Sequence, residues 1–377
     1  MYNRTLKSII EAKINKGKAI ILIGPRQVGK TTLIKEIINQ KEYLFLDSDD
    51  STVMNLLNSP NTEQIRSIIG NYKLIFIDEA QRIEGIGLTL KIITDQFKDV
   101  QLLVSGSSSF DLSNALNEPL TGRKWEFELY PISWEEFEEK HNYLVAEQQL
   151  ENRLLYGFYP DILNHPGEER DLLKQLVSSY LYQDILSFSK IRKPEVLEKL
   201  VQALALQMGN EVNYNELAKT IGIDKNTVAN YIDILEKGFV IFKLDSFSRN
   251  LRNEIKKNKK IYFYDNGVRN TVIGNFKPLE MRQDKGALWE NFLISERLKQ
   301  NTYKNTNAKM YFWRTKQQQE VDLVEEKEGI ITGFEFKWKT KSKIKLPKTF
   351  VNEYNATEVI IDRNNFREFT VISEEPH

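Results

Sequence analysis

A glycine-rich segment near the amino terminus carries residue types that bind phosphate. Gly24, Gly29, Lys30 and Thr31 reproduce the pattern GxxxxGK[ST], in which backbone N–H groups surround phosphate oxygens at the start of a helix. We expect Lys30 to reach the β- and γ-phosphates of ATP, and Thr31 to ligate Mg²⁺. The predicted nucleotide-binding residues are Gly24, Pro25, Arg26, Gln27, Val28, Gly29, Lys30, Thr31 and Thr32.

A pair of carboxylates ends a second apolar run. In KLIFIDEAQ, Asp78 and Glu79 follow residues 74–77, which have the composition of a buried strand. A P-loop protein needs such a carboxylate on the next core strand to hold Mg²⁺ through water, and Asp78 has this position. Glu79 is then the predicted base that orients the attacking water. The pair favours hydrolysis over binding alone.

Two further residues are candidates for the same chemistry. Ser107 lies near the end of the strand-like run at residues 101–109, where its hydroxyl is expected to touch the γ-phosphate or the attacking water. A serine-glycine turn is an almost equal alternative. Arg123, after the glycine in LTGRKWEFELYPIS, is the best-placed arginine to act on the nucleotide of a neighbouring subunit, which would imply a homo-oligomer. A surface arginine at a turn explains it equally well.

The carboxyl-terminal part contains a different constellation, Asp322 followed by Glu335-Phe336-Lys337. Glu335 and Lys337 share a face of an extended strand because side chains alternate. Two carboxylates can hold Mg²⁺ against a scissile phosphate, and a nearby lysine can orient water, so the set suits phosphodiester hydrolysis. Glu290, in the preceding helical segment, is a candidate third carboxylate. A DNA-docking fold without activity, or a network of buried ion pairs, remains an alternative.

The middle of the chain has a pattern typical of a winged helix-turn-helix. Residues 215–238 predict helix, turn and helix, followed by the β-prone FVIFKL. Lys225, Asn226, Thr227 and Asn230 would project from the start of the second helix, the position that reads a DNA groove. Acidic residues on that helix weaken the DNA interpretation, and a protein contact is the alternative.

Two basic segments add to a possible DNA surface. Residues 249–260 carry six basic residues and one acidic residue. Lys337, Lys339, Lys341, Lys343 and Lys345 recur at period two, which on an extended strand places them on one face. Such a stripe could follow a phosphate backbone, although lysines also protect edge strands against aggregation.

The elements that must position these residues alternate in type. Short β-prone runs at residues 19–23, 43–47, 74–77 and 101–109 are separated by helical patterns, which predicts a parallel α/β sheet. The carboxyl-terminal elements follow the order α-β-β-β-α-β, which is that of a restriction-endonuclease-like core. With 53 basic and 53 acidic residues, the chain has no overall field that attracts nucleic acid or a membrane.

Composition excludes several kinds of site. The 377 residues include no cysteine and three histidines, so disulfides, thiolate metal sites and cysteine nucleophiles are absent, and a zinc cluster is disfavoured. No apolar run approaches the roughly 20 residues that span a bilayer, and residues 1–18 do not resemble a signal peptide. We expect a cytoplasmic protein without a membrane partner.

Several of these segments together resemble one family. GPRQVGKTT, YLFLDSDD, LIFIDEAQRI, LLVSGSSSF and LTGR followed by YPIS are similar to the AAA+ ATPase domain of a bacterial and archaeal family. In that family the ATPase is fused to a carboxyl-terminal domain of unknown function, whose second half resembles PD-(D/E)xK nucleases. The resemblance implies Walker A at Gly29, Lys30 and Thr31, Walker B at Asp78 and Glu79, and a sensor at Ser107. It places the family's GR pair at Arg123.

The predicted organisation is an AAA+ ATPase domain over residues 1–150, a helical linker over 151–200, a winged helix-turn-helix over 201–247 and a PD-(D/E)xK nuclease-like domain over 248–377. The predicted function is ATP binding and hydrolysis, with ATP and Mg²⁺ as cofactors, coupled to DNA binding or processing. A nucleotide-switched scaffold whose carboxyl-terminal domain binds a protein and cuts nothing is the alternative.

Overall fold

The computed structural model describes residues 1–107, 119–179, 194–248, 259–339 and 344–371. They form two compact units, the first made of Met1–Ile132 with Lys237–Phe239, and the second of Ser133–Glu236 with Val240–His377. The expected boundary near residue 150 falls inside helix α7 (Trp134–Tyr156), which packs against α15 (Asn266–Val272) and α16 (Lys285–Tyr303) of the second unit.

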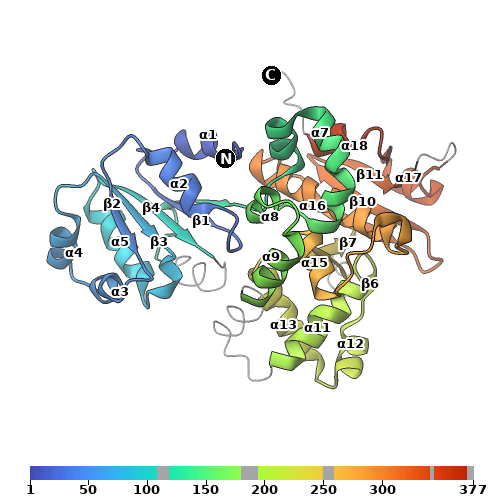
Figure 1. The fold of residues 1–377 in the computed structure, drawn as a ribbon, viewed down its shortest axis with the longest axis horizontal. Coiled ribbons are helices and arrows are strands. Elements are labelled where there is room, and N and C mark those ends of the chain that lie inside the picture. Colours follow the sequence, from blue (N-terminus) through green and yellow to red (C-terminus); the bar gives the residue numbers. More distant parts are fainter. Residues whose placement is uncertain (108–118, 180–193, 249–258, 340–343, 372–377) are drawn as a thin grey trace. The chain divides into compact units, whose positions relative to one another are not determined.

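A parallel sheet of five strands organises the first unit, and Figure 1 draws it in blue and cyan beside its helices. The strand order is β2-β3-β4-β1-β5, and each neighbouring pair is parallel. The strands are β1 (Ala19–Ile23), β2 (Leu44–Asp47), β3 (Leu74–Asp78), β4 (Gln101–Gly106) and β5 (Lys124–Glu128). The helices are α1 (Leu6–Glu11), α2 (Lys30–Ile38), α3 (Ser51–Leu57), α4 (Thr62–Ile69), η1 (Ala80–Arg82) and α5 (Ile86–Gln96).

Composition explains why three of these strands lie at the centre. Every residue of β1, β3 and β4 is buried, as expected for apolar runs that helices cover on both faces of a parallel sheet. The strand β4 lies between β1 and β3, so the predicted partner strand of the P-loop is not its direct neighbour. Sequence order does not reveal this, because parallel strands are joined by crossovers.

The second unit contains a sheet of seven strands in the order β12-β11-β10-β9-β7-β8-β6. These are β6 (Glu211–Val212), β7 (Ile241–Ser246), β8 (Lys259–Phe263), β9 (Lys309–Arg314), β10 (Glu320–Lys327), β11 (Ile330–Phe336) and β12 (Thr357–Ile361). Strand β8, which lies in the region predicted as the last domain (248–377), pairs with β7 and β6. One sheet therefore runs through both regions predicted as separate domains.

The helices of this unit include α12 (Tyr214–Ile221) and α13 (Lys225–Lys237), which cover the residues predicted as helix, turn and helix. The elements from α16 through β9, β10, β11, α17 (Lys348–Tyr354) and β12 follow the predicted order α-β-β-β-α-β. Phe350 and Tyr354 of α17 pack with Trp313 and Val321 in a core on one face of the sheet. The remaining helices are α8 (Pro160–Asn164), α9 (Glu169–Leu176), α11 (Pro194–Leu206), η3 (Leu279–Met281) and α18 (Phe366–Thr370).

The structure bears on the two positively charged segments that the sequence had assigned to a DNA surface. The strand β11 ends at Phe336, so Lys337 and Lys339 do not belong to it. Lys341 and Lys343 lie outside the described residues, as do most of the basic segment at 249–260 and residues 180–193 of the predicted helical linker.

Candidate functional site

The carboxyl ends of β1, β4 and β3 meet at one edge of the first sheet. The P-loop follows β1, Asp78 ends β3, and Ser105 lies near the end of β4. Because β4 lies between the other two strands, its Ser105 is flanked by both. This edge, where loops leave parallel strands, is the usual binding site of open α/β sheets.

Glycine conformation shapes the P-loop. Gly29 has φ 95° at the start of α2, and Gly24 has φ 153°. A Cβ atom on Gly24 would lie 2.1 Å from the carbonyl oxygen of Leu129, so only glycine fits. The guanidinium of Arg4 donates to the carbonyl of Val28 at 2.8 Å and to that of Tyr130 at 2.6 Å, which ties the loop to neighbouring backbone. No sequence motif had indicated Arg4.

Lys30 is buried without a carboxylate in direct contact. Its Nζ donates to the carbonyls of Gly24 and Pro25, both at 2.9 Å. Burial lowers the pKa of Lys30 to about 8, although the charges of Glu79 and Asp78 partly oppose this. A buried ammonium held by neutral carbonyls is stabilised when an anion binds beside it, so the lysine suits a phosphate group.

Thr31 and Asp78 are brought together as the predicted Mg²⁺ pair. The Thr31 hydroxyl donates to the two carboxylate oxygens of Asp78 at 2.8 and 3.1 Å. Ser105 donates its hydroxyl to Oδ1 of the same carboxylate. A hydroxyl and a carboxylate are oxygen donors of the type that Mg²⁺ prefers, and waters usually complete its shell. The residues therefore fit a nucleotide-bound Mg²⁺ ion.

Glu79 and Ser107 are connected through a residue that the sequence had not singled out. The side-chain amide of Gln81 donates to Oε2 of Glu79 at 2.5 Å and to Oγ of Ser107 at 2.8 Å. The backbone N–H of Glu79 donates to Oγ of Ser105 at 3.3 Å. The structure thus places the predicted base and the predicted sensor within one hydrogen-bonded group.

Arg123 lies at the opposite edge of the sheet. Its carbonyl accepts the N–H of Ala19, the first residue of β1, whereas the P-loop follows Ile23. Four strand residues span about 13 Å. The guanidinium is bound to Asp95, at 2.6 Å, and to the carbonyl of Thr121. Arg123 is therefore remote from its own nucleotide site, and only a role in another subunit stays a prediction.

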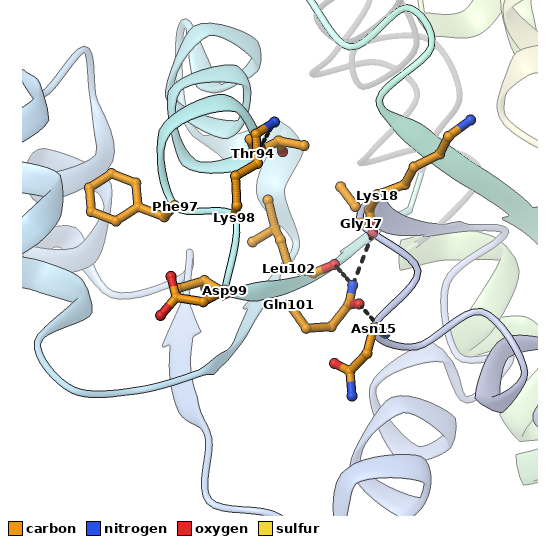
Figure 2. Close-up of a pocket in the computed structure, with 11 residues that line it drawn as sticks. Asn15, Gly17, Lys18, Thr94, Phe97, Lys98, Asp99, Gln101 and Leu102 are labelled. Carbon is orange, nitrogen blue, oxygen red and sulfur yellow. Dashed lines mark hydrogen bonds between the residues drawn. The ribbon is translucent and has the colours of Figure 1, made fainter.

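A hollow of about 170 Å³ also lies at this far edge, next to the first residues of β1 and β4. Figure 2 shows Gln101 inside it, reaching toward Asn15. Gln101 accepts the N–H of Asn15 and donates to the carbonyls of Lys18 and Leu102, so its amide is engaged by backbone. The hollow contains none of the predicted site residues.

The second unit brings together the predicted carboxyl-terminal residues. Lys337 donates to Oε1 of Glu335 at 2.5 Å, and Asp322 accepts the N–H of Phe336 at 2.8 Å. Burial raises the pKa of Asp322 well above its ordinary value, and the charges of Glu290 and Glu335 raise it further.

Lys260, on β8, lies in the same cluster, whereas the sequence had placed it in the basic segment at 249–260 as part of a DNA surface. It is 1% exposed, and its Nζ lies 2.5 Å from Glu320 and 3.2 Å from Glu290. Tyr262 donates its hydroxyl to Glu290 at 2.6 Å. Burial would lower the pKa of Lys260, but the charges of Glu290, Glu320 and Asp322 outweigh it and raise the pKa.

These contacts bear on the predicted metal site at Asp322, Glu335 and Glu290. Within the described ranges, no three histidine or acidic side chains are placed as ligands of one metal ion. The carboxylates are of a suitable type for Mg²⁺, but the ammonium group of Lys260 already pairs with Glu290, and that of Lys337 with Glu335. A metal ion at this position would have to displace these lysines.

The predicted DNA-reading helix begins with a local cap. Asp224 accepts the N–H groups of Asn226 and Thr227 at 2.9 and 3.0 Å, which holds the start of α13. Lys225, Asn226 and Asn230 are exposed, whereas Thr227 is half-buried and bonded to Asp224. Asp233 and Glu236, which had weakened the DNA interpretation, both form ion pairs with Lys243 of β7.

Comparison with known proteins agrees with the N-terminal site. Residues 16–138 match the model of an AAA domain. Residues 147–279 and 285–371 match two domains of unknown function, DUF8612 and DUF4143. The Walker-type ATPase of Pyrococcus abyssi has a similar fold, with a TM-score of 0.51 and 15% identity, over 72% of this chain and 96% of that chain.

Uncharacterized proteins are similar to this chain over most of its length. One, from Mycobacterium tuberculosis, is 26% identical over 329 residues, which cover 86% of this chain and 71% of that protein. Another, from Methanocaldococcus jannaschii, is 24% identical over 338 residues, 84% of this chain and 74% of that protein.

The first unit thus contains an AAA domain whose P-loop follows β1. In this chain it is joined to a carboxyl-terminal DUF4143 domain, as the family resemblance had implied. Among the described helices, none has the length and apolar composition needed to cross a membrane.

Lys30 and Arg123 lie at opposite edges of the first sheet, so their substitution should affect ATP binding differently. Lys30→Ala should abolish binding of a fluorescent ATP analogue in the concentration range that saturates the parent, because it removes the cation that faces the phosphates. Arg123→Ala should leave the dissociation constant within about two-fold, since this residue lies at the far edge. A large loss of affinity in Arg123→Ala, with an unchanged unfolding temperature, would contradict this placement.

Proposed function

We propose that the protein hydrolyses ATP at the carboxyl edge of the first sheet and couples its nucleotide state to DNA binding or processing. The observation that carries the hydrolysis proposal is the pairing of Thr31 with Asp78 beside the Glu79–Gln81–Ser107 group. In this assignment Lys30 holds the β- and γ-phosphates, Thr31 and Asp78 hold Mg²⁺, and Glu79 acts on water. Ser107 contacts the γ-phosphate or that water.

Binding and turnover should separate at Glu79. Glu79→Gln should keep the dissociation constant of ATP within about two-fold and lower kcat by about 10²- to 10⁴-fold, because the amide cannot accept a proton from water. Radiolabelled ATP under single-turnover conditions, together with equilibrium binding, measures both quantities. Equal turnover in Glu79→Gln and the parent would remove Glu79 from the base role.

The DNA part of the proposal is supported by the exposed start of α13. Lys225, Asn226 and Asn230 face solvent there, and the acidic residues further along the helix are paired with Lys243. Basic and amide side chains at a helix start are suited to phosphates and base edges. The competing proposal is a nucleotide-switched scaffold in which this helix contacts a protein.

A titration with duplex DNA separates these two proposals. DNA coupling predicts a mobility shift at low salt that weakens as salt rises, together with a changed rate of ATP turnover. The control is Lys225→Ala, which should weaken the shift without changing turnover in the absence of DNA. If DNA changes neither mobility nor turnover of the parent, the DNA proposal falls and the scaffold proposal is favoured.

A nuclease centre in the second unit is a second candidate function. The convergence of Asp322, Glu335 and Glu290 with Lys337 supports it, since carboxylates and a lysine are the parts that metal-dependent phosphodiester hydrolysis needs. The position of Lys260 favours the other interpretation, in which the same residues form a buried ion-pair network. A metal ion would have to displace this lysine.

The substitution Lys260→Met is expected to distinguish the two interpretations. For an ion-pair network, it leaves carboxylates without their counter-charge and should lower the free energy of unfolding by about 3–5 kcal/mol in EDTA. Mn²⁺ should raise the free energy of unfolding of Lys260→Met part of the way back to the parent value. It should leave the free energy of unfolding of the parent unchanged. Cleavage of plasmid DNA by the parent in Mg²⁺ or Mn²⁺, lost in both Asp322→Ala and Lys337→Ala, would instead establish the nuclease.

A further inference from the structure

The turn after β3 contains a polar side chain between the predicted base and the predicted sensor. Gln81 belongs to the short helix η1 and is half-buried. One amide nitrogen donates to both Glu79 and Ser107, at 2.5 and 2.8 Å. The backbone N–H of Ser107 donates to Oε1 of Gln81 at 3.4 Å, so both ends of the amide are engaged. Because the nitrogen donates and the oxygen accepts, the amide has one defined orientation.

The backbone around this contact limits other arrangements. Glu79 has φ 51° and ψ 41°, the left-handed region that is costly for a residue with a side chain. Its N–H is held by Ser105, and Ser107 is 3% exposed at the end of β4. Because the backbone of Glu79 is held in this way, its carboxylate can move only by rotation about the side-chain bonds. Gln81 restrains that remaining freedom.

We propose that Gln81 is a positioning residue that couples Ser107 to the Glu79 carboxylate, and this inference rests on the proposed ATP hydrolysis. Gln81 engages Oε2 of Glu79, and Oε1 is then the oxygen that accepts a proton from water. The water oxygen bonds to the γ-phosphorus as the bond from that phosphorus to the β–γ bridging oxygen breaks. When the γ-phosphate contacts Ser107, the amide of Gln81 couples that contact to the Glu79 carboxylate.

The proposal assigns Gln81 an effect on the chemical step and not on nucleotide affinity. Gln81→Ala should lower kcat by about 10- to 100-fold and leave KM for ATP within about two-fold, because misdirection of a general base removes part of its contribution. Gln81→Glu should be at least as defective, since it replaces the donor by a second carboxylate beside Glu79. Arg82→Gln is the matched control, because Arg82 is an exposed neighbour in the same turn and pairs with Asp49.

A double-mutant cycle tests whether Gln81 acts through Glu79. In the Glu79→Gln background, Gln81→Ala should cause no further loss of single-turnover rate. Ser107→Ala combined with Gln81→Ala should likewise lose less than the product of the two single effects. Thermal unfolding of each variant shows whether the turn remains folded, and a merely structural residue would lower stability and rate equally in both backgrounds.

The outcomes distinguish failure of the Gln81 role from failure of the proposed ATP hydrolysis. A parent-like kcat in Gln81→Ala, or the same fold-loss in both backgrounds, overturns the role of Gln81 and leaves ATP hydrolysis intact if Glu79→Gln is still inactive. Absence of turnover in the parent, or full turnover in Glu79→Gln, overturns the proposed function and the Gln81 role together.

Discussion

The position of β4 between β1 and β3 is the constraint on which the N-terminal site depends. It places Ser105 beside Asp78 and lets the Asp78 carboxylate accept from Thr31 at the start of α2. The three carboxyl ends are brought to one edge because all neighbouring strands are parallel. Were β3 the direct neighbour of β1, Ser105 of β4 would not lie between the strand before the P-loop and the strand that ends at Asp78.

Two buried lysines illustrate how environment separates binding sites from structural contacts. Lys30 is surrounded by backbone carbonyls, so burial lowers its pKa and an incoming anion would be stabilised. Lys260 is surrounded by carboxylates, which raise its pKa and already balance its charge. The two lysines are buried to a similar extent, but the charge of Lys30 can still be balanced by an anionic ligand. The charge of Lys260 is already balanced by carboxylates.

The second unit depends on a continuous sheet. Strand β7 pairs with β8 on one side and with β9 on the other, so the strands after the helix-turn-helix and the carboxylate cluster share one framework. Lys260 lies on β8, whereas Glu320 and Asp322 lie on β10. Contact across these strands joins regions that the chain separates by about sixty residues, and only folding brings them together.

Local sequence determined much of the ATPase domain. The spacing of Gly24, Gly29, Lys30 and Thr31, and the apolar run before Asp78 and Glu79, sufficed to predict the strand–loop–helix and the carboxylate pair, because these features involve neighbouring residues. The tertiary structure decided what depends on distant contacts. It placed Gln81 between Glu79 and Ser107, Arg123 at the far edge and Lys260 among the carboxylates. No pattern of adjacent residues encodes such positions, since strand order and packing create them.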